Sequence, residues 1–168
     1  RDLNCAVEAY LPERRSEGYG LNSDAVRKIR ERGAGLMITA DCGITGVKEV
    51  ALANEIGLDV IVTDHHQVGK EGLPQAVAVL NPHRKECDYP FRFLSGVGLA
   101  FKLGLGVRSG LHTTGRKKEN LPNMKRHLDL FALGTIADVA PLTGENHILT
   151  RHGLDVLSTS AKPGLVAL

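Results

Sequence analysis

The stretch Asp59-Val60-Ile61-Val62-Thr63-Asp64-His65-His66 is the part of the sequence that decides the fold. Its first five residues are mostly β-branched and apolar, a composition typical of a buried parallel strand. Such a strand normally ends in turn residues, but this one ends in a carboxylate and two imidazoles. Because these groups are ligands of divalent cations, the stretch predicts both a buried sheet and a metal site at its edge.

A second apolar stretch, Leu36-Met37-Ile38-Thr39-Ala40, also ends in a carboxylate, at Asp41. Apolar runs of this length that alternate with helical segments predict an α/β fold with a parallel sheet and crossover helices. The predicted strands cover 36–41, 59–64 and 76–80, and the predicted helices among them cover 24–32 and 46–56. Ser23 and Thr45 are the expected N-caps of the two helices.

The two ends of the chain have different patterns. Residues 5–10 alternate between apolar and polar side chains, which predicts a strand, and 11–21 are expected to form a loop. After residue 94 the apolar positions recur at helical spacing, with one polar, basic interruption that is expected to be a mobile loop. The expected helices cover 95–107, 122–137 and 145–157, the loop covers 108–121, and Pro163-Gly164 breaks the chain after the last helix.

The two strand-end aspartates are the first candidate site residues. In a parallel sheet, ligands bind beyond the carboxyl ends of the strands, where Asp41 and Asp64 are predicted to lie. Neighbouring strands are about 4.8 Å apart, and two ionised carboxylates that close repel each other unless a cation lies between them. We therefore expect both to be metal ligands, with a role of Asp41 as a helix N-cap as the alternative.

His65 and His66 are expected to have different roles. Consecutive residues beyond a strand point in different directions, so one imidazole is expected on the metal and the other toward substrate. Simple loop histidines are the alternative. Asp138 is a lone acid among apolar and small residues, and such an acid is costly to bury unless it is paired or bound to a metal. It is a further candidate ligand, with capping of the following helix as the alternative.

Weaker signals point to phosphate binding. Ser95, Gly96 and Gly98 open a predicted helix, where glycines let a phosphate approach the backbone. Packing between helices through small residues explains them equally well. Asn81, at the end of the third strand, is expected to face the same crevice and to orient a ligand or water. His83 is expected to be an ordinary surface residue.

Composition sets limits on the class of protein. The 168 residues are 42% hydrophobic, enough for a packed core, and no apolar run reaches the roughly 18 residues of a membrane span. The three cysteines are odd in number and far apart, so a reducing cytoplasm without disulfides is expected. Basic residues between 108 and 126 indicate either phosphate contacts or a solvated loop. An aromatic content of 4% without tryptophan argues against base stacking.

Taken in order, several blocks of this sequence resemble the DHH phosphoesterase family. The matching blocks are Glu17-Gly18-Tyr19-Gly20-Leu21, Thr39-Ala40-Asp41-Cys42-Gly43, Thr63-Asp64-His65-His66, Asn81-Pro82, residues 95–103 and residues 134–142. The resemblance implies a Rossmann-like domain that uses two Mn²⁺ or Mg²⁺ ions to hydrolyse single-stranded DNA from its 5′ end, in DNA repair and recombination.

The resemblance also implies roles for single residues. Asp41 would bridge both metal ions, and Asp138 would supply another carboxylate ligand. Asp64 and His65 would belong to the same metal site, with His65 a direct ligand. His66 would contact or polarise the scissile phosphate, and Asp64, His65 and His66 together would carry catalysis.

The sequence departs from the family pattern at both ends. The family's Asp-rich first motif would precede Cys5, and the DHH-associated domain would follow the chain, so a fragment of the catalytic core with little activity of its own is expected. Residues 1–160 would form a partial DHH domain, with a strand-helix part over 1–93 and a helical part over 94–160, and 161–168 would begin a linker.

Partners and competing functions remain open at this point. A single-strand-binding protein or a helicase is the expected partner of the intact enzyme besides DNA, and the oligomeric state is undetermined. The first alternative is a DHH enzyme that cleaves short oligonucleotides, cyclic dinucleotides or pyrophosphate. The second is a DHH-like replication scaffold without catalysis.

Overall fold

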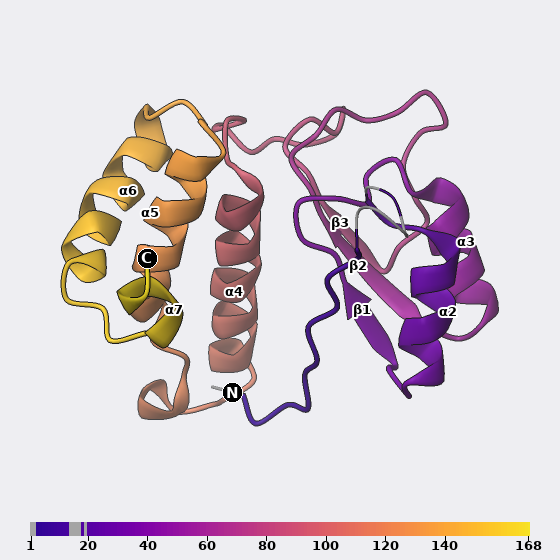
Figure 1. The fold of residues 1–168 in the computed structure, drawn as a ribbon, viewed down its shortest axis with the longest axis horizontal. Coiled ribbons are helices and arrows are strands. Elements are labelled where there is room, and N and C mark those ends of the chain that lie inside the picture. The colour runs from indigo at the N-terminus through magenta and orange to yellow at the C-terminus, as the bar shows by residue number, and fades with distance from the viewer. Residues whose placement is uncertain (1–2, 14–17, 19) are drawn as a thin grey trace. The chain divides into compact units, whose positions relative to one another are not determined.

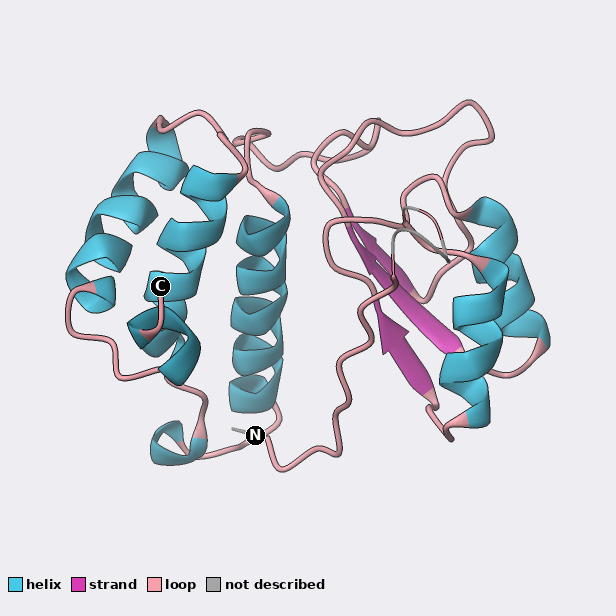
Figure 2. Cartoon of the chain, in the orientation of Figure 1, coloured by secondary structure: helices cyan, strands magenta, loops and turns pink. Residues whose placement is uncertain are grey.

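The fold was analysed in a computed structural model, which describes residues 3–13, 18 and 20–168. The chain forms two compact units, one of residues 6–89 and one of residues 1–5 with 90–168. All strands of the described residues belong to the first unit, and the second is helical (Figures 1 and 2). None of the described helices combines the length and the apolar character that crossing a membrane requires.

The first unit is built on a parallel sheet, as predicted. Its three strands, in the order β1-β2-β3, are β1 (Leu36–Ile38), β2 (Asp59–Thr63) and β3 (Ala78–Leu80). Met37 pairs with Val60 and Val62 with Val79, both in parallel register. Helices α2 (Ser23–Glu31) and α3 (Val47–Glu55) lie side by side on one face of this sheet (Figure 1). The α/β fold class is thereby confirmed.

The core of this unit lies between the sheet and the two helices. Met37, Val60 and Val62 project from the strands onto Val26 of α2 and Val50 of α3. Alternation along a strand sends Leu36 and Ile38 to the opposite face, where they are half exposed. Burial of the first set fixes the strand register, because a slip by one residue would expose it.

Several local predictions for this unit are wrong. Residues 5–10 form no strand, since Val7 is exposed and no neighbouring strand pairs with them. Helix α2 is capped by Asn22, whose Oδ1 accepts from the Ala25 N–H (2.8 Å), and not by Ser23. Helix α3 has Gly46 and not Thr45 as its N-cap. The connection from β2 to β3 contains no crossover helix.

The second unit consists of packed helices joined by two 3₁₀ turns. They are α4 (Gly96–Thr113), η1 (Lys118–Asn120), η2 (Met124–His127), α5 (Leu128–Ala137), α6 (Gly144–Leu157) and α7 (Pro163–Val166). Helix α5 packs against both α4 and α6. Glycines allow this: a Cβ on Gly153 would lie 2.2 Å from the Leu128 carbonyl oxygen, and one on Gly134 would lie 2.7 Å from Val97.

Two predicted boundaries in this unit need correction. Helix α4 runs on to Thr113, so the expected loop 108–121 is shorter and contains η1. The helix expected from residue 122 begins as the 3₁₀ turn η2 before α5. The segment 161–168 includes α7, which Pro163 opens because its fixed φ suits a first helical position. That this segment begins a linker stays a prediction.

A buried ion pair attaches the C-terminal segment to α5. Asp129 is 1% exposed, and its carboxylate accepts hydrogen bonds from Lys162 Nζ and from Ser160 Oγ (2.8 Å). Burial alone would raise the pKa of Asp129, but the hydrogen bonds from Lys162, Ser160 and the Leu130 N–H hold it below its usual range. The ionised carboxylate therefore stabilises the folded unit.

This contact predicts a pH-dependent stability. Because the folded-state pKa of Asp129 is lowered, its contribution is fully present above the unfolded-state pKa of about 3.9 and is lost as the pH falls through the folded value. Asp129→Asn should lower the free energy of unfolding at pH 7 by about 2 kcal/mol. In urea titrations this difference in the free energy of unfolding should shrink toward pH 3. The exposed control Asp155→Asn should leave the free energy of unfolding unchanged at both pH values. An Asp129→Asn deficit that stays constant down to pH 3 would contradict the assignment.

Candidate active site

Two threonines hold the ends of β1 and β2 together. Thr63 Oγ1 donates to the Thr39 carbonyl oxygen (2.6 Å), and the Thr63 N–H donates to Thr39 Oγ1 (3.2 Å). The sheet pairing continues past β1 through the Asp41 N–H, which donates to the Thr63 carbonyl oxygen (3.0 Å). The two strand ends are thereby fixed in register, which places the residues that follow them next to each other.

The turn after β1 contains two residues with positive φ angles, which most residue types rarely adopt. Asp41 has φ 63°, in the left-handed region that a non-glycine residue rarely adopts. Gly43 has φ +103°, and a Cβ there would approach Thr39 Oγ1 to 3.0 Å, so only glycine fits. A strained residue held by its surroundings is a common feature of functional sites, and here the strain falls on a predicted ligand.

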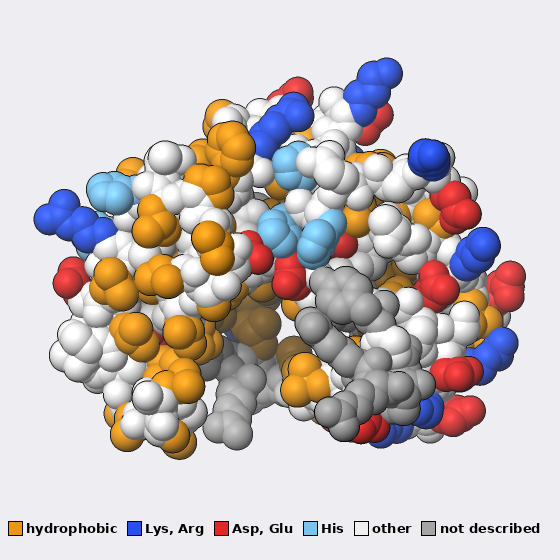
Figure 3. All heavy atoms as spheres, turned by 45° about the horizontal axis from the view of Figure 1, so that its top comes forward, with side chains coloured by type: hydrophobic (Ala, Val, Ile, Leu, Met, Phe, Trp, Pro, Cys, Tyr) orange, Lys and Arg blue, Asp and Glu red, His pale blue; other side chains and the backbone are white. Residues whose placement is uncertain are grey.

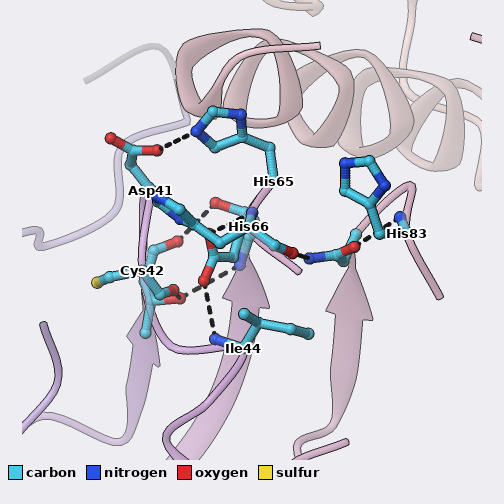
Figure 4. Close-up of polar contacts among 10 residues, drawn as sticks. Asp41, Cys42, Ile44, His65, His66 and His83 are labelled. Atoms are coloured by element: carbon cyan, nitrogen blue, oxygen red, sulfur yellow. Dashed lines mark hydrogen bonds and ion pairs between the residues drawn. The ribbon is translucent and has the colours of Figure 1, made fainter. Parts of the chain in front are cut away.

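Asp41, His65 and His66 converge at this edge of the sheet. One potential ligand atom from each lies within 4.8 Å of the other two, the one such group of three within the described part of the chain. His65 Nε2 lies 2.9 Å from Asp41 Oδ1, and the two imidazole centroids are 4.7 Å apart (Figure 4). Figure 3 shows histidine side chains gathered beside acidic ones on the surface. A carboxylate and two imidazoles at this spacing are a donor set for a divalent cation.

Asp64 lies beneath this group. It is 1% exposed; its Oδ2 accepts from the Ile44 N–H (2.9 Å), and its Oδ1 accepts from the His66 N–H (3.1 Å). His66 Nδ1 lies 2.6 Å from the same Oδ1. Because an ionised carboxylate only accepts hydrogen bonds, Nδ1 carries the hydrogen and Nε2 becomes the nitrogen directed outward. Asp64 therefore positions His66, and its predicted role as a direct metal ligand stays a prediction.

Cys42 also lies in this turn. Burial raises the pKa of its thiol, and the charges of Asp64 and Asp41 raise it further. The thiol is therefore neutral at physiological pH and a poor ligand or nucleophile. Oxygen and nitrogen donors define the site, which favours the harder divalent cations. Cys5, Cys42 and Cys87, all among the described residues, form no disulfide.

Asn81 connects two loops of the site. It is 4% exposed; its Nδ2 donates to the His66 carbonyl oxygen (2.9 Å), and its Oδ1 accepts from the His83 N–H (2.7 Å). Both ends of the amide are thus used within the protein, so Asn81 acts as a bracket, and its predicted contact with a ligand stays a prediction. Figure 4 shows the His83 ring beyond the end of β3, on the same side as the His65 ring.

Sequence reasoning treated His83 as an ordinary surface residue and missed this placement. The signal that was available is its position two residues after a strand end, at the edge where Asp41 and His65 also lie. A residue so close to a parallel strand end faces the ligand side of the sheet.

The remaining candidates belong to the helical unit. Ser95 caps α4, with Oγ accepting from the Gly98 N–H (3.4 Å) and lying 3.2 Å from Thr135 Oγ1. Ser95, Gly96 and Gly98 are buried, and a Cβ on Gly98 would meet Leu94 at 3.2 Å. These contacts favour the helix-packing account of the three residues. Phosphate binding by them stays a prediction.

Asp138 is exposed at the C-cap of α5, in the helical unit. The next residue, Val139, has φ 55°, and its N–H bonds to the Ile136 carbonyl oxygen while the Ala140 N–H bonds to that of Thr135. This is a Schellman helix end with valine in the position that glycine usually takes. A β-branched residue in this region is a strained exception beside a predicted ligand. Convergence of Asp138 with the strand-end group stays a prediction.

One matching block cannot be placed. Glu17 and Tyr19 of the block Glu17-Gly18-Tyr19-Gly20-Leu21 lie outside the described residues, whereas Gly18 and Gly20 are described, both with positive φ.

A parallel sheet that presents a carboxylate and two imidazoles at its carboxyl edge defines an α/β domain with a divalent-metal site. The family model described as "DHH family, N-terminal domain" matches residues 1–135. The chain belongs to the DHH family.

Relatives in this family are named exonucleases. The chain is 45% identical over 166 residues to the single-stranded-DNA-specific exonuclease RecJ of Bacillus subtilis, and 43% identical over 173 residues to that of Escherichia coli. These matches cover 99% and 100% of this chain but 20% and 30% of the relatives. The chain therefore spans less than a third of the length of these relatives.

The fold resembles solved structures of the same enzyme. A crystal structure of exonuclease RecJ bound to manganese matches with a TM-score of 0.76 and 37% identity, over 93% of this chain and 37% of that chain. RecJ in complex with Mn²⁺ from Thermus thermophilus matches with a TM-score of 0.69 and 35% identity, over 88% of this chain and 21% of that chain. The resemblance read from the motifs is confirmed.

Because Asp64 is hydrogen-bonded within the protein, its substitution should affect stability as well as Mn²⁺ affinity, unlike that of a residue that only binds metal. Asp64→Ala should cost about 1–3 kcal/mol of stability, because it removes the acceptor of the buried Ile44 N–H. Asp64→Asn keeps the shape but loses an acceptor facing His66. We expect it to weaken Mn²⁺ binding about 10–100-fold, as changes behind a ligand do, with a smaller loss of thermal stability.

Isothermal titration with Mn²⁺ measures the affinity, and the exposed Asp59→Asn on the same strand is the matched control. Nitrogen NMR of the metal-free protein should find the hydrogen of His66 on Nδ1 in the parent chain. Unchanged affinity in Asp64→Asn, or a hydrogen on Nε2 in the parent, would exclude the positioning role.

Proposed function

We propose that this chain is part of a metal-dependent phosphodiesterase that hydrolyses single-stranded DNA from the 5′ end. The observation that carries the proposal is the gathering of Asp41, His65 and His66 ligand atoms within 4.8 Å at the sheet edge. The names of relatives that match nearly the whole chain support the substrate. The 5′ polarity comes from the resemblance to the DHH phosphoesterase family.

The residues present fit Mn²⁺ or Mg²⁺. Asp41 supplies a carboxylate oxygen, and His65 supplies an imidazole nitrogen next to it. Mn²⁺ and Mg²⁺ take about six ligands, of which waters fill several. We propose that Asp138 adds a carboxylate, and that two ions bind in the intact enzyme. When bound, such ions polarise a phosphoryl oxygen and lower the pKa of a coordinated water.

The chain's own residues then orient the reacting groups. Asp64 fixes the His66 ring through Nδ1, so that Nε2 would be the nitrogen that meets a bound metal ion or a non-bridging phosphate oxygen. The bracket of Asn81 holds the His66 carbonyl and the His83 backbone in one arrangement. We propose that His83 contacts the phosphodiester next to His66, because its ring lies at the same edge of the sheet (Figure 4).

Partners and compartment extend the same proposal. An enzyme that acts on single-stranded DNA works where such DNA arises, in repair and recombination in the cytoplasm of a bacterial cell. A single-strand-binding protein or a helicase would supply the substrate there. The free thiols of Cys5, Cys42 and Cys87 are compatible with a reducing compartment.

The test measures metal binding and DNA hydrolysis together. The 168-residue chain should bind Mn²⁺ in calorimetry, and Asp41→Ala and His65→Ala should each weaken this binding at least about tenfold, as expected for lost ligands. The exposed His112→Ala on α4 is the matched control and should bind like the parent. Absence of Mn²⁺ binding, or unchanged binding in Asp41→Ala, would contradict the metal site and favour a scaffold.

Hydrolysis is assayed on 5′-labelled single-stranded DNA with Mn²⁺. The described cluster offers three donors for about six positions, so this chain should turn over far more slowly than the RecJ of B. subtilis. A rate equal to that of the relative would show the described set to be sufficient and refute the need for further ligands. Cleavage of dinucleotides in preference to long strands would replace single-stranded DNA as the substrate class.

A further inference from the structure

Besides the strand-end site, the helical unit has a feature that favours anions, on the segment between α4 and α5. A cavity of about 490 Å³ opens there, and its polar lining consists of Arg116, Arg126, Glu119, Asn120 and Asn123, together with Asn4 from the start of the chain. All these residues belong to one compact unit. A volume in this range is typical of small-ligand sites, but the lining is polar rather than apolar.

The walls of this cavity are held by hydrogen bonds from outside it. Arg108 Nε donates to the Pro122 carbonyl oxygen (3.0 Å), and Lys162 Nζ donates to that of Arg126 (2.6 Å). Lys162 is fixed in turn by the buried carboxylate of Asp129. Asn123 Oδ1 accepts from the Lys125 N–H (3.2 Å), which sets the start of η2. The segment that carries the cavity is therefore attached to both α4 and α5.

The charge of the lining is unbalanced. Residues 116–126 carry five cationic side chains and one carboxylate, that of Glu119. Among the described residues, neither the Arg116 nor the Arg126 guanidinium forms an ion pair. Two guanidinium groups against the single carboxylate of Glu119, beside amide groups that donate hydrogen bonds, leave the lining with a net positive charge that is complementary to an anion. Guanidinium binds phosphate oxygens in a bidentate manner.

We propose that this cavity binds the phosphate backbone of single-stranded nucleic acid, at a second contact distinct from the strand-end site. Exposed Lys117, Lys118 and Lys125 flank the cavity and extend its charge along the surface, which suits a polyanion better than a single phosphate. The asparagine amides can additionally donate to or accept from base edges. The identity of the polymer rests on the proposed function, whereas the anion site rests on the cavity alone.

The experiment measures binding of fluorescent (dT)12 in EDTA, where the metal site contributes nothing. The double variant Arg116→Ala/Arg126→Ala should weaken binding at least about tenfold, as expected for the loss of two charge-assisted contacts. The slope of log K against log salt should become shallower by about 1.4, since each lost phosphate contact is worth about 0.7 on single strands. The matched control Arg27→Ala/Lys48→Ala removes the same charge from exposed positions of the other unit. It should change affinity about twofold or less.

A second measurement locates the site. The side-chain amide resonances of Asn120 and Asn123 should shift when (dT)12 is added to the parent chain. Equal weakening in both double variants, or unshifted amides, would overturn the proposal. So would competition by dTMP as effective, per phosphate, as that by (dT)12, which would identify a free-nucleotide site. Polyglutamate that binds as tightly as (dT)12 through the same arginines would identify an acidic-peptide site and also overturn it.

The outcome is separable from that of the proposed function. If the chain binds (dT)12 through Arg116 and Arg126 but neither binds Mn²⁺ nor cleaves DNA, the proposed function fails and the second contact stands. If Mn²⁺ binds and DNA is cleaved while the arginine variant binds like the parent, only the second contact is overturned.

Discussion

The buried carboxylate of Asp64 is the contact on which the site depends. It reaches the Ile44 N–H in the loop after β1 and the ring of His66 in the loop after β2. Two loops that the sheet merely brings close are thereby joined into one rigid surface. A carboxylate buried to this degree is tolerated because hydrogen bonds replace the lost water. Asp41 and His65, which belong to these two loops, can then be held close to each other.

Much of this arrangement could be predicted because it follows from strand periodicity. Apolar runs that end in acids define where parallel strands stop, and parallel strands stop at a common edge. Asp41 and Asp64 were therefore expected at one metal site together with one of the two histidines; the structure gathers Asp41, His65 and His66, and Asp64 is buried. The helical unit was predictable in outline from a different periodicity, because apolar residues in α5 recur at helical spacing.

The rest depends on contacts that a pattern does not encode. Whether Asp64 ligates a metal or anchors a ring is decided by the Ile44 N–H, twenty residues away in the chain. The bracket of Asn81 is equally non-local. Residues 5–10 alternate like a strand, but alternation alone cannot provide a pairing partner. Helix α4 runs past its predicted end to Thr113. The prediction ended the helix where polar side chains begin, but side-chain polarity does not determine where backbone hydrogen bonding stops.

We propose that Asp41, His65 and His66 form a cation site at the carboxyl edge of the sheet. Anomalous diffraction from crystals soaked in Mn²⁺ would locate the ion. We expect a manganese peak within about 2.0–2.4 Å of the Asp41 carboxylate and of at least one of the two imidazoles, distances usual for oxygen and nitrogen ligands. Manganese bound elsewhere, or a diffraction map without a peak between these three side chains, would contradict it.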